Sequence, residues 1–146
     1  MSRIVCLWFA FASLVFAQSG PLFCTPSAVP PLVHSEGLAE RLGDILLDCA
    51  GGPPGPVAGN LAFFLTVPIA NQVSATGVVD AILTVDNVAV TAPATLLSSN
   101  AIVFNGFTFT VPPSGRVSIR LTNLRGNVNV LGFEGGQIVF ASLAFN

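Results

Sequence analysis

Apolar and polar side chains alternate with a period of two along several short stretches of this chain, which is the pattern of β-strands with one buried face. The cleanest stretch lies between residues 117 and 122, where Val117, Ile119 and Leu121 alternate with polar neighbours. Residues 61–67 are largely apolar on both faces, which predicts a central, covered strand. The other strands are expected at residues 44–49, 78–85, 88–91, 102–104, 107–109, 128–130 and 137–144.

Turn-forming residues separate these stretches. The Asn-Gly pair at positions 105–106 is the strongest local signal, because it tolerates the positive φ of a type I′ hairpin turn. Such a hairpin would place Phe104 opposite Phe107, and the next pair outward would be Ile102 and Phe109. All four side chains would then face the core. Further turns or loops are expected at residues 51–56, 86–87, 112–115 and 135–136.

Residues 38–49 fit two kinds of secondary structure. Leu38, Leu42 and Ile45 recur at helical spacing. The residues Ile45, Leu47 and Cys49 instead alternate as in a strand. Each glycine within a helix here would cost about 1 kcal/mol, and the rest of the chain has β character. We favour the strand, with the two aspartates of this stretch on its more solvated face.

The number and spacing of the strands define the fold class. Seven or eight short strands with turns at near-regular spacing predict an all-β, antiparallel β-sandwich, either immunoglobulin-like or jelly-roll-like. The alternative is a small closed β-barrel. A length of 146 residues fits one domain of either kind.

Residues 1–17 predict an export signal. A single arginine near the start precedes an uncharged apolar run over residues 4–16, and Ala17 ends a stretch suited to signal peptidase. These thirteen residues are too few to cross roughly 30 Å of hydrocarbon, which disfavours a membrane anchor. We expect a secreted chain, extracellular or at the cell surface, with the periplasm as a further option. Residues 18–146 would form one β-sandwich domain with no membrane span, beginning with an extended, proline-rich arm at residues 18–31.

Two cysteines remain after removal of the signal, which contains Cys6. Because an exported chain enters an oxidising compartment, we expect a disulfide between Cys24 and Cys49. Such a bridge would close a loop of 26 residues, worth roughly 3.5 kcal/mol in the chain-entropy model. The alternatives are two buried free thiols or a metal site that includes His34, but this set offers at most three ligands without a zinc-like spacing.

Charged residues are scarce. The mature chain would hold four arginines and no lysine against seven acidic residues, a net charge of −3. Phosphate binding requires clustered cations, so the sequence predicts no nucleic acid partner. An anionic membrane surface is disfavoured for the same reason.

Residues that could support catalysis or metal binding are isolated from one another in the sequence. The lone histidine, His34, is followed by Ser35 and Glu36, but neighbours along an extended chain point to opposite sides and cannot form a triad with each other. Asp80 and Asp86 could serve as a glycosidase pair, or as a calcium site with the neighbouring asparagine, but capping of turns is the simpler role. We expect no enzyme activity, no catalytic or metal-binding residue and no cofactor.

A family resemblance rests on motifs in two stretches. Residues 35–52 contain Glu-Gly, then Gly-Asp-Ile, then a cysteine followed closely by Gly-Gly. Residues 116–126 form a later strand motif that contains three arginines. In these features the chain resembles uncharacterised exported bacterial β-rich proteins. The resemblance implies an exported β-sandwich. Because such a segment can precede immunoglobulin-like modules in longer members, it also implies a short member or a fragment, with a neighbouring Ig-like domain as a partner. It implies no site residues.

Two function classes are therefore considered. The first is a secreted, non-catalytic structural or adhesive domain that acts through its surface or through strand-mediated assembly. Residues 137–144 favour it, because they are apolar on both faces and contain neither lysine nor proline, so at a sheet edge they could pair with a second copy or a neighbouring domain. The alternative is a small extracellular binding module, for example for carbohydrate, although tyrosine is absent and Trp8 leaves with the signal. A hydrolase ranks third.

Overall fold

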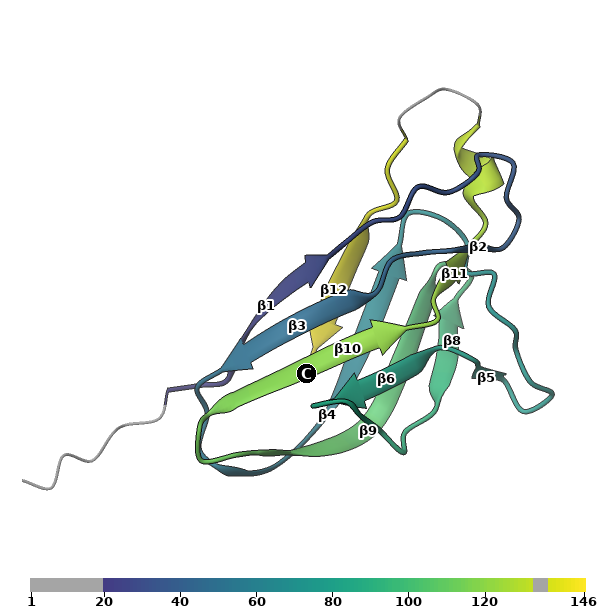
Figure 1. Cartoon of the computed structure of the whole chain (residues 1–146). Coiled ribbons are helices and arrows are strands. Elements are labelled where there is room, and N and C mark those ends of the chain that lie inside the picture. The colour runs from purple at the N-terminus through teal and green to yellow at the C-terminus, as the bar shows by residue number, and fades with distance from the viewer. Residues whose placement is uncertain (1–19, 133–136) are drawn as a thin grey trace, which may run out of the picture.

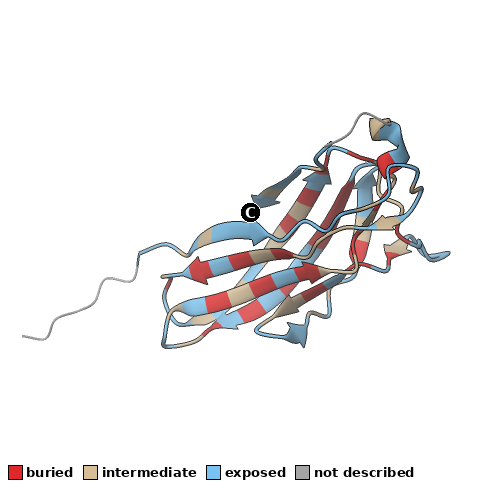
Figure 2. Ribbon diagram, turned by 45° about the horizontal axis from the view of Figure 1, so that its top comes forward, coloured by how far each residue is buried: buried red, intermediate tan, exposed pale blue. Residues whose placement is uncertain are grey.

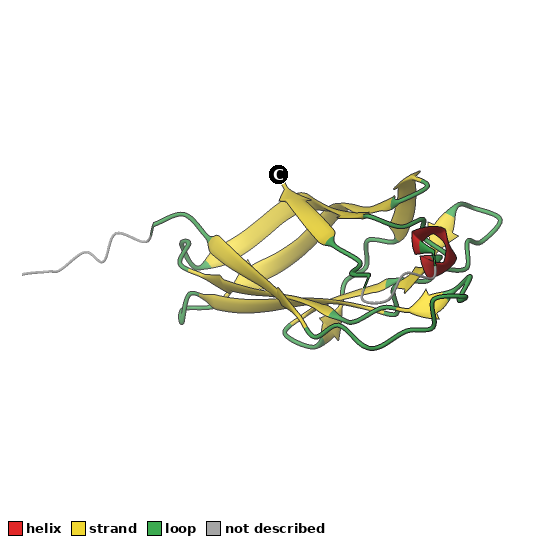
Figure 3. Cartoon of the chain, turned by 90° about the horizontal axis from the view of Figure 1, so that it is seen from above, coloured by secondary structure: helices red, strands yellow, loops and turns green. Residues whose placement is uncertain are grey.

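The computed structural model describes residues 20–132 and 137–146, and the predicted signal at residues 1–17 lies outside them. This described part is all-β and forms two five-stranded antiparallel sheets that pack face to face (Figure 1). The two sheets stay separate in the described part of the chain, which confirms the β-sandwich and excludes the closed barrel. Seen from above, the sheets form two layers (Figure 3).

Each sheet is named here after one of its strands. The β3 sheet has the order β1 (Phe23–Ala28), β3 (Ile45–Ala50), β10 (Arg116–Thr122), β6 (Ile82–Val85) and β7 (Val88–Ala89). The β4 sheet has the order β12 (Ala141–Phe145), β4 (Gly55–Leu65), β9 (Ala101–Val111), β8 (Ala94–Ser98) and β5 (Val78–Val79). A small third pairing joins β2 (Glu40–Arg41) to β11 (Arg125–Gly126).

The core lies between the two large sheets. Buried residues alternate with exposed ones along the central strands (Figure 2), because successive side chains of a strand point to opposite faces. The largest fully buried side chains are Phe63, Phe104, Phe107, Leu61, Leu83, Ile102, Ile119 and Leu121.

Strands β3 and β10 confirm the sequence prediction for their segments. In β3, Ile45, Leu47 and Cys49 are buried while Asp48 is exposed. Asp44, just before β3, accepts a hydrogen bond from Arg120 Nη2 at 2.6 Å. The stretch therefore resolves as a strand, since its period-two pattern matches a sheet with one buried face. The turn expected at residues 112–115 joins β9 to β10 and is closed by the Gly115 N–H, which donates to the Pro112 carbonyl.

The prediction of a hairpin turn at residues 105–106 is wrong. Strand β9 continues through this pair, and Asn105 and Gly106 form a β-bulge opposite Asn60 of β4. Gly106 has a φ of +61°, and its N–H donates to Asn60 Oδ1 at 2.8 Å. A bulge and a hairpin turn can both require positive φ, so the Asn-Gly pair indicates the backbone conformation but does not distinguish between the two structures.

The four apolar residues around the bulge still face the core, as predicted. Ile102, Phe104, Phe107 and Phe109 are all buried. These residues lie opposite residues of β4 and β8 instead of opposite one another. The extra residue of the bulge shifts the alternation of β9 by one, so that these side chains face the core both before and after the bulge.

Several element boundaries also differ from the sequence predictions. Residues 78–85 split into β5 and β6, which belong to different sheets, so the chain crosses the sandwich at this point. The strand expected at residues 128–130 is a 3₁₀ helix, Val128–Leu131. Part of the loop expected at residues 51–56 belongs to β4, which begins at Gly55, and the last strand begins only at Ala141. The arm is extended as expected, but residues 23–28 within it pair with β3 as a full edge strand.

Strand β4 is central, as predicted, but its outer face is not covered: Phe64 is 36% exposed.

The turn at residues 86–87 is confirmed, because Asp86 and Asn87 both have positive φ and connect β6 to β7. Within the described residues, no helix has the length and apolar character that crossing a membrane requires.

Candidate functional site

The titratable residues singled out in the sequence lie apart in the structure. His34 is exposed in a turn, where its carbonyl accepts a hydrogen bond from the Gly37 N–H at 2.9 Å. Asp80 and Asp86 flank the two ends of β6, which separates them by roughly 20 Å along the strand. Within the described ranges, no three metal-ligating side chains come together.

Asp80 and Asp86 each take part in backbone organisation. Asp80 Oδ1 accepts a hydrogen bond at 2.6 Å from the amide of Asn71, a residue with only 8% exposure. The same amide donates to the Asn123 carbonyl, and its oxygen accepts from the Arg125 N–H. Asp86 Oδ1 accepts from the Ser118 N–H at 2.9 Å. The bonds of Asp80 and Asn71 hold the crossover between the sheets and the segment that follows β10, and the bond of Asp86 ties the turn after β6 to β10.

The predicted disulfide is present. Cys24 and Cys49 lie directly opposite each other on β1 and β3 and are bonded. Most β1 side chains are exposed, so little apolar burial holds this strand in place. The disulfide and the backbone pairing with β3 therefore anchor β1 as an edge of the sandwich.

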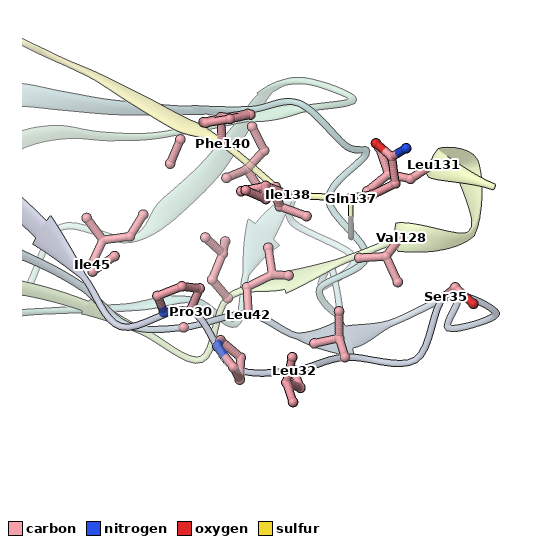
Figure 4. Close-up of a pocket in the computed structure, with 18 of the residues that line it drawn as sticks. Pro30, Leu32, Ser35, Leu42, Ile45, Val128, Leu131, Gln137, Ile138 and Phe140 are labelled. Atoms are coloured by element: carbon pink, nitrogen blue, oxygen red, sulfur yellow. The ribbon is translucent and has the colours of Figure 1, made fainter. Parts of the chain in front are cut away.

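The two sheets end on one side in the edge strands β1 and β12. The opposite side is bridged by the chain as it passes from β5 to β6, but no segment of the described chain bridges β1 and β12 in this way. An apolar groove opens there between the two edges (Figure 4). Its larger part has a volume of about 730 Å³ and its smaller part about 280 Å³.

The two parts of the groove adjoin, because both are lined by Pro26 of β1 and Leu143 of β12. Core side chains form the floor. They are Ile45, Leu65 and Leu124 in the larger part and Leu47, Leu61 and Ile119 in the smaller part. No aspartate, glutamate, arginine or histidine is among the described residues that line either part. The groove therefore offers apolar packing to whatever enters it.

Hydrogen bonds to β4 determine which backbone groups of β12 remain free. Asn146 exchanges two backbone hydrogen bonds with Asn60, at 2.7 and 3.1 Å, so its polar groups point toward β4. Backbone direction alternates along an antiparallel strand. The N–H and C=O groups of Ala141, Leu143 and Phe145 therefore point to the open edge.

The two edges differ in their capacity to pair with another strand. Strand β1 contains Pro26, which has no N–H donor and so blunts that edge. Strand β12 contains neither proline nor a charged residue. Of these two edges, β12 is the one whose backbone can continue a hydrogen-bond ladder.

Comparison with known proteins adds no identification: no family model, curated protein or solved structure matches the chain.

The groove itself was not predicted from the sequence. Its floor consists of ordinary core positions, and the order of strands in a sheet cannot be read from composition. One signal did point toward it, namely the uncharged and proline-free character of residues 137–144.

Proposed function

We propose that this protein is an exported, non-catalytic structural or adhesive domain that assembles by adding an extended strand of another polypeptide to β12. One observation carries the proposal: the free, uncharged edge of β12 borders an apolar groove between the two sheets. An incoming strand can satisfy the backbone groups of Ala141, Leu143 and Phe145 and place alternate side chains in the groove.

The energetics of an open edge support this role. An unpaired edge strand without lysine, proline or bulge is a template for pairing with other chains, and natural proteins usually blunt such an edge. Here Pro26 removes one N–H donor from β1, whereas β12 contains no proline and no charged residue that would hinder pairing. Filling the groove would also cover exposed apolar side chains of its lining, such as Phe23, Ile138 and Phe140, which is favourable in proportion to the apolar area removed from water.

Export is part of the proposal and rests on three features. The sequence begins with a predicted signal at residues 1–17. The Cys24–Cys49 disulfide is typical of oxidising compartments. The motifs in residues 35–52 resemble those of exported β-rich bacterial proteins.

A carbohydrate-binding role is less well supported by the groove. Sugar recognition needs several converging polar groups, often beside an exposed aromatic platform. Among the side chains that line the larger part, Ser27, Ser35 and Gln137 can form hydrogen bonds, and the rest are apolar or glycine. We therefore argue only for strand addition.

The test uses a synthetic peptide as strand donor. It has the sequence of residues 137–146, which contains no charged side chain, and two added lysines for solubility. We expect it to bind the mature protein and to protect the amides of Leu143 and Phe145 from hydrogen exchange. Ala141→Pro removes one N–H at the open edge without removing a hydrogen bond to β4, and we expect binding at least about tenfold weaker.

The control for this variant is Ala141→Val, which keeps the N–H and should bind as the wild type does. Thermal unfolding of both variants checks that they are folded. Failure of the peptide to bind the wild type, or equal binding by Ala141→Pro, would contradict strand addition at β12.

A further inference from the structure

Exposed apolar side chains gather around the same opening of the sandwich. They belong to β1 and the segment after it on one side, and to β12 and the segment before it on the other. Each is at least 45% exposed. The residues are Phe23, Val29, Leu32, Ile138, Phe140 and Phe145. Their combined exposed area is of the order of the roughly 800 Å² that each partner contributes to a stable interface.

We infer that the strand donor is β12 of a second copy of this chain, paired antiparallel about a two-fold axis that passes beside Leu143. This inference rests on the proposed function, since it names the partner for the same edge. A symmetric pair of this kind joins the two β4 sheets into one continuous sheet.

The register follows from the backbone groups that face the open edge. In an antiparallel ladder, residues that point their N–H and C=O groups across the gap lie opposite one another. With the axis beside Leu143, Ala141 pairs with Phe145 of the partner subunit, and all three edge-facing residues of each copy find partners. An axis beside Ser142 or Ala144 leaves one of the three without a partner inside the strand.

The symmetry also brings the two open sides of the sandwiches together. A two-fold axis perpendicular to the joined sheet keeps both β3 sheets on the same face of it. The two β1 edges then face each other across the axis, and the two grooves meet. Leu143 of each copy points into the joined groove, and the surrounding apolar side chains can cover those of the other copy.

The charge distribution permits this contact between identical surfaces. Near a two-fold axis each residue lies close to its own copy, so any charge there would meet a like charge and destabilise the pair. The strand β12 carries no charge, and none is found among the described residues lining the groove. By contrast, β10 exposes Arg116 and Arg120, so a symmetric contact through that strand would be repulsive.

Single-cysteine variants of the full mature protein test the register. Leu143→Cys should form a covalent dimer under oxidation, because the two Cα atoms would lie about 5.5 Å apart. Ala141→Cys alone should not, since its two copies would be separated by roughly 13 Å along the strands. A mixture of Ala141→Cys with Phe145→Cys should cross-link again, and this pair leaves Leu143 in place. Peptide mapping distinguishes these bonds from the native Cys24–Cys49 bridge.

Sedimentation separates failure of this inference from failure of the proposed function. We expect the wild type to form a dimer and Ala141→Pro to be monomeric at the same concentration. A monomeric wild type that still binds the 137–146 peptide would overturn the second copy as partner and keep β12 as the accepting edge. A dimer that cross-links through Ala141→Cys alone, or that persists in Ala141→Pro, would overturn the proposed pairing.

Discussion

At the scale of single residues, the bulge at Gly106 determines which side chains of β9 reach the core. Its φ of +61° lies in the left-handed region, which costs an L-residue with a Cβ atom energy that glycine avoids. The Gly106 N–H is held by Asn60 Oδ1. Because the bulge shifts the alternation, a change in its geometry would affect the inward orientation of both Phe104 and Phe107.

We predict that Gly106→Ala lowers the free energy of unfolding by about 1–2 kcal/mol. A Cβ atom at this position would meet no atom within 4 Å, so the expected loss comes from backbone strain and not from a clash. Gly106→Asn serves as the matched control and should lose less, because asparagine tolerates positive φ. Urea denaturation measures both values. Stability of Gly106→Ala equal to that of the wild type would show that the bulge accommodates the side chain without strain.

The same pair of residues shows how far a local sequence signal can be trusted. Asn-Gly at 105–106 indicated a positive φ, and Gly106 has one. Whether the chain reverses there depends on the eleven-residue strand β4, which pairs with β9 on both sides of the bulge. That pairing joins residues that are between 37 positions (Phe64 and Ala101) and 56 positions (Gly55 and Val111) apart, so no local pattern contains it.

At the scale of elements, β1 depends on its disulfide more than the other strands of its sheet do. It pairs only with β3 and buries little of its side-chain surface, whereas β3 has β10 on its other edge. A disulfide stabilises a fold mainly by restricting the unfolded chain. Here it also connects a sparsely packed strand to a well-packed one.

We predict that Cys24→Ala combined with Cys49→Ala lowers the free energy of unfolding by about 3–4 kcal/mol. Hydrogen exchange should become fast in β1 while β4 and β9 keep their protection, since their packing does not involve the bridge. Wild-type protein reduced with a thiol is the control that removes the bond but no side-chain atoms. Unchanged exchange in β1 of the reduced protein would indicate that backbone pairing alone holds the strand.

The elements that were mispredicted share a physical cause. Residues 78–85 are mostly apolar and are predicted to form one strand, yet the chain crosses between the sheets at Asp80, where Asn71 holds the aspartate by a hydrogen bond. Residues 128–131 have valines suited to a strand but wind into a 3₁₀ helix. The period-two pattern therefore predicts which residues of β3 and β10 are buried, but it carries no information on the order of strands within a sheet. The groove depends on that order, which is why only its β12 side had a sequence signal.

At the scale of the whole molecule, the two sheets differ in charge. No strand of the β4 sheet contains an acidic or basic residue, whereas the β3 sheet carries Asp48, Arg116 and Arg120. The edge proposed for assembly belongs to the uncharged sheet. Contacts made there would consist of backbone hydrogen bonds and apolar packing.

We predict that self-association depends little on ionic strength. Salt screens interactions between exposed charges, and the proposed contact has none. The dissociation constant, measured by sedimentation, should change by less than about twofold between about 0.05 and 0.5 M sodium chloride. Weakening by about tenfold over this range would point to association through the charged β3 sheet instead.

The disulfide between β1 and β3 also determines how the molecule would carry a mechanical load. When the chain is pulled from both ends, tension that enters at Cys24 passes through the bridge directly to Cys49. The 24 residues between them carry no tension, so roughly 80 Å of chain cannot be extended while the bond is intact. The exposed loop that contains His34 would thus stay slack under a force that stretches the rest of the domain.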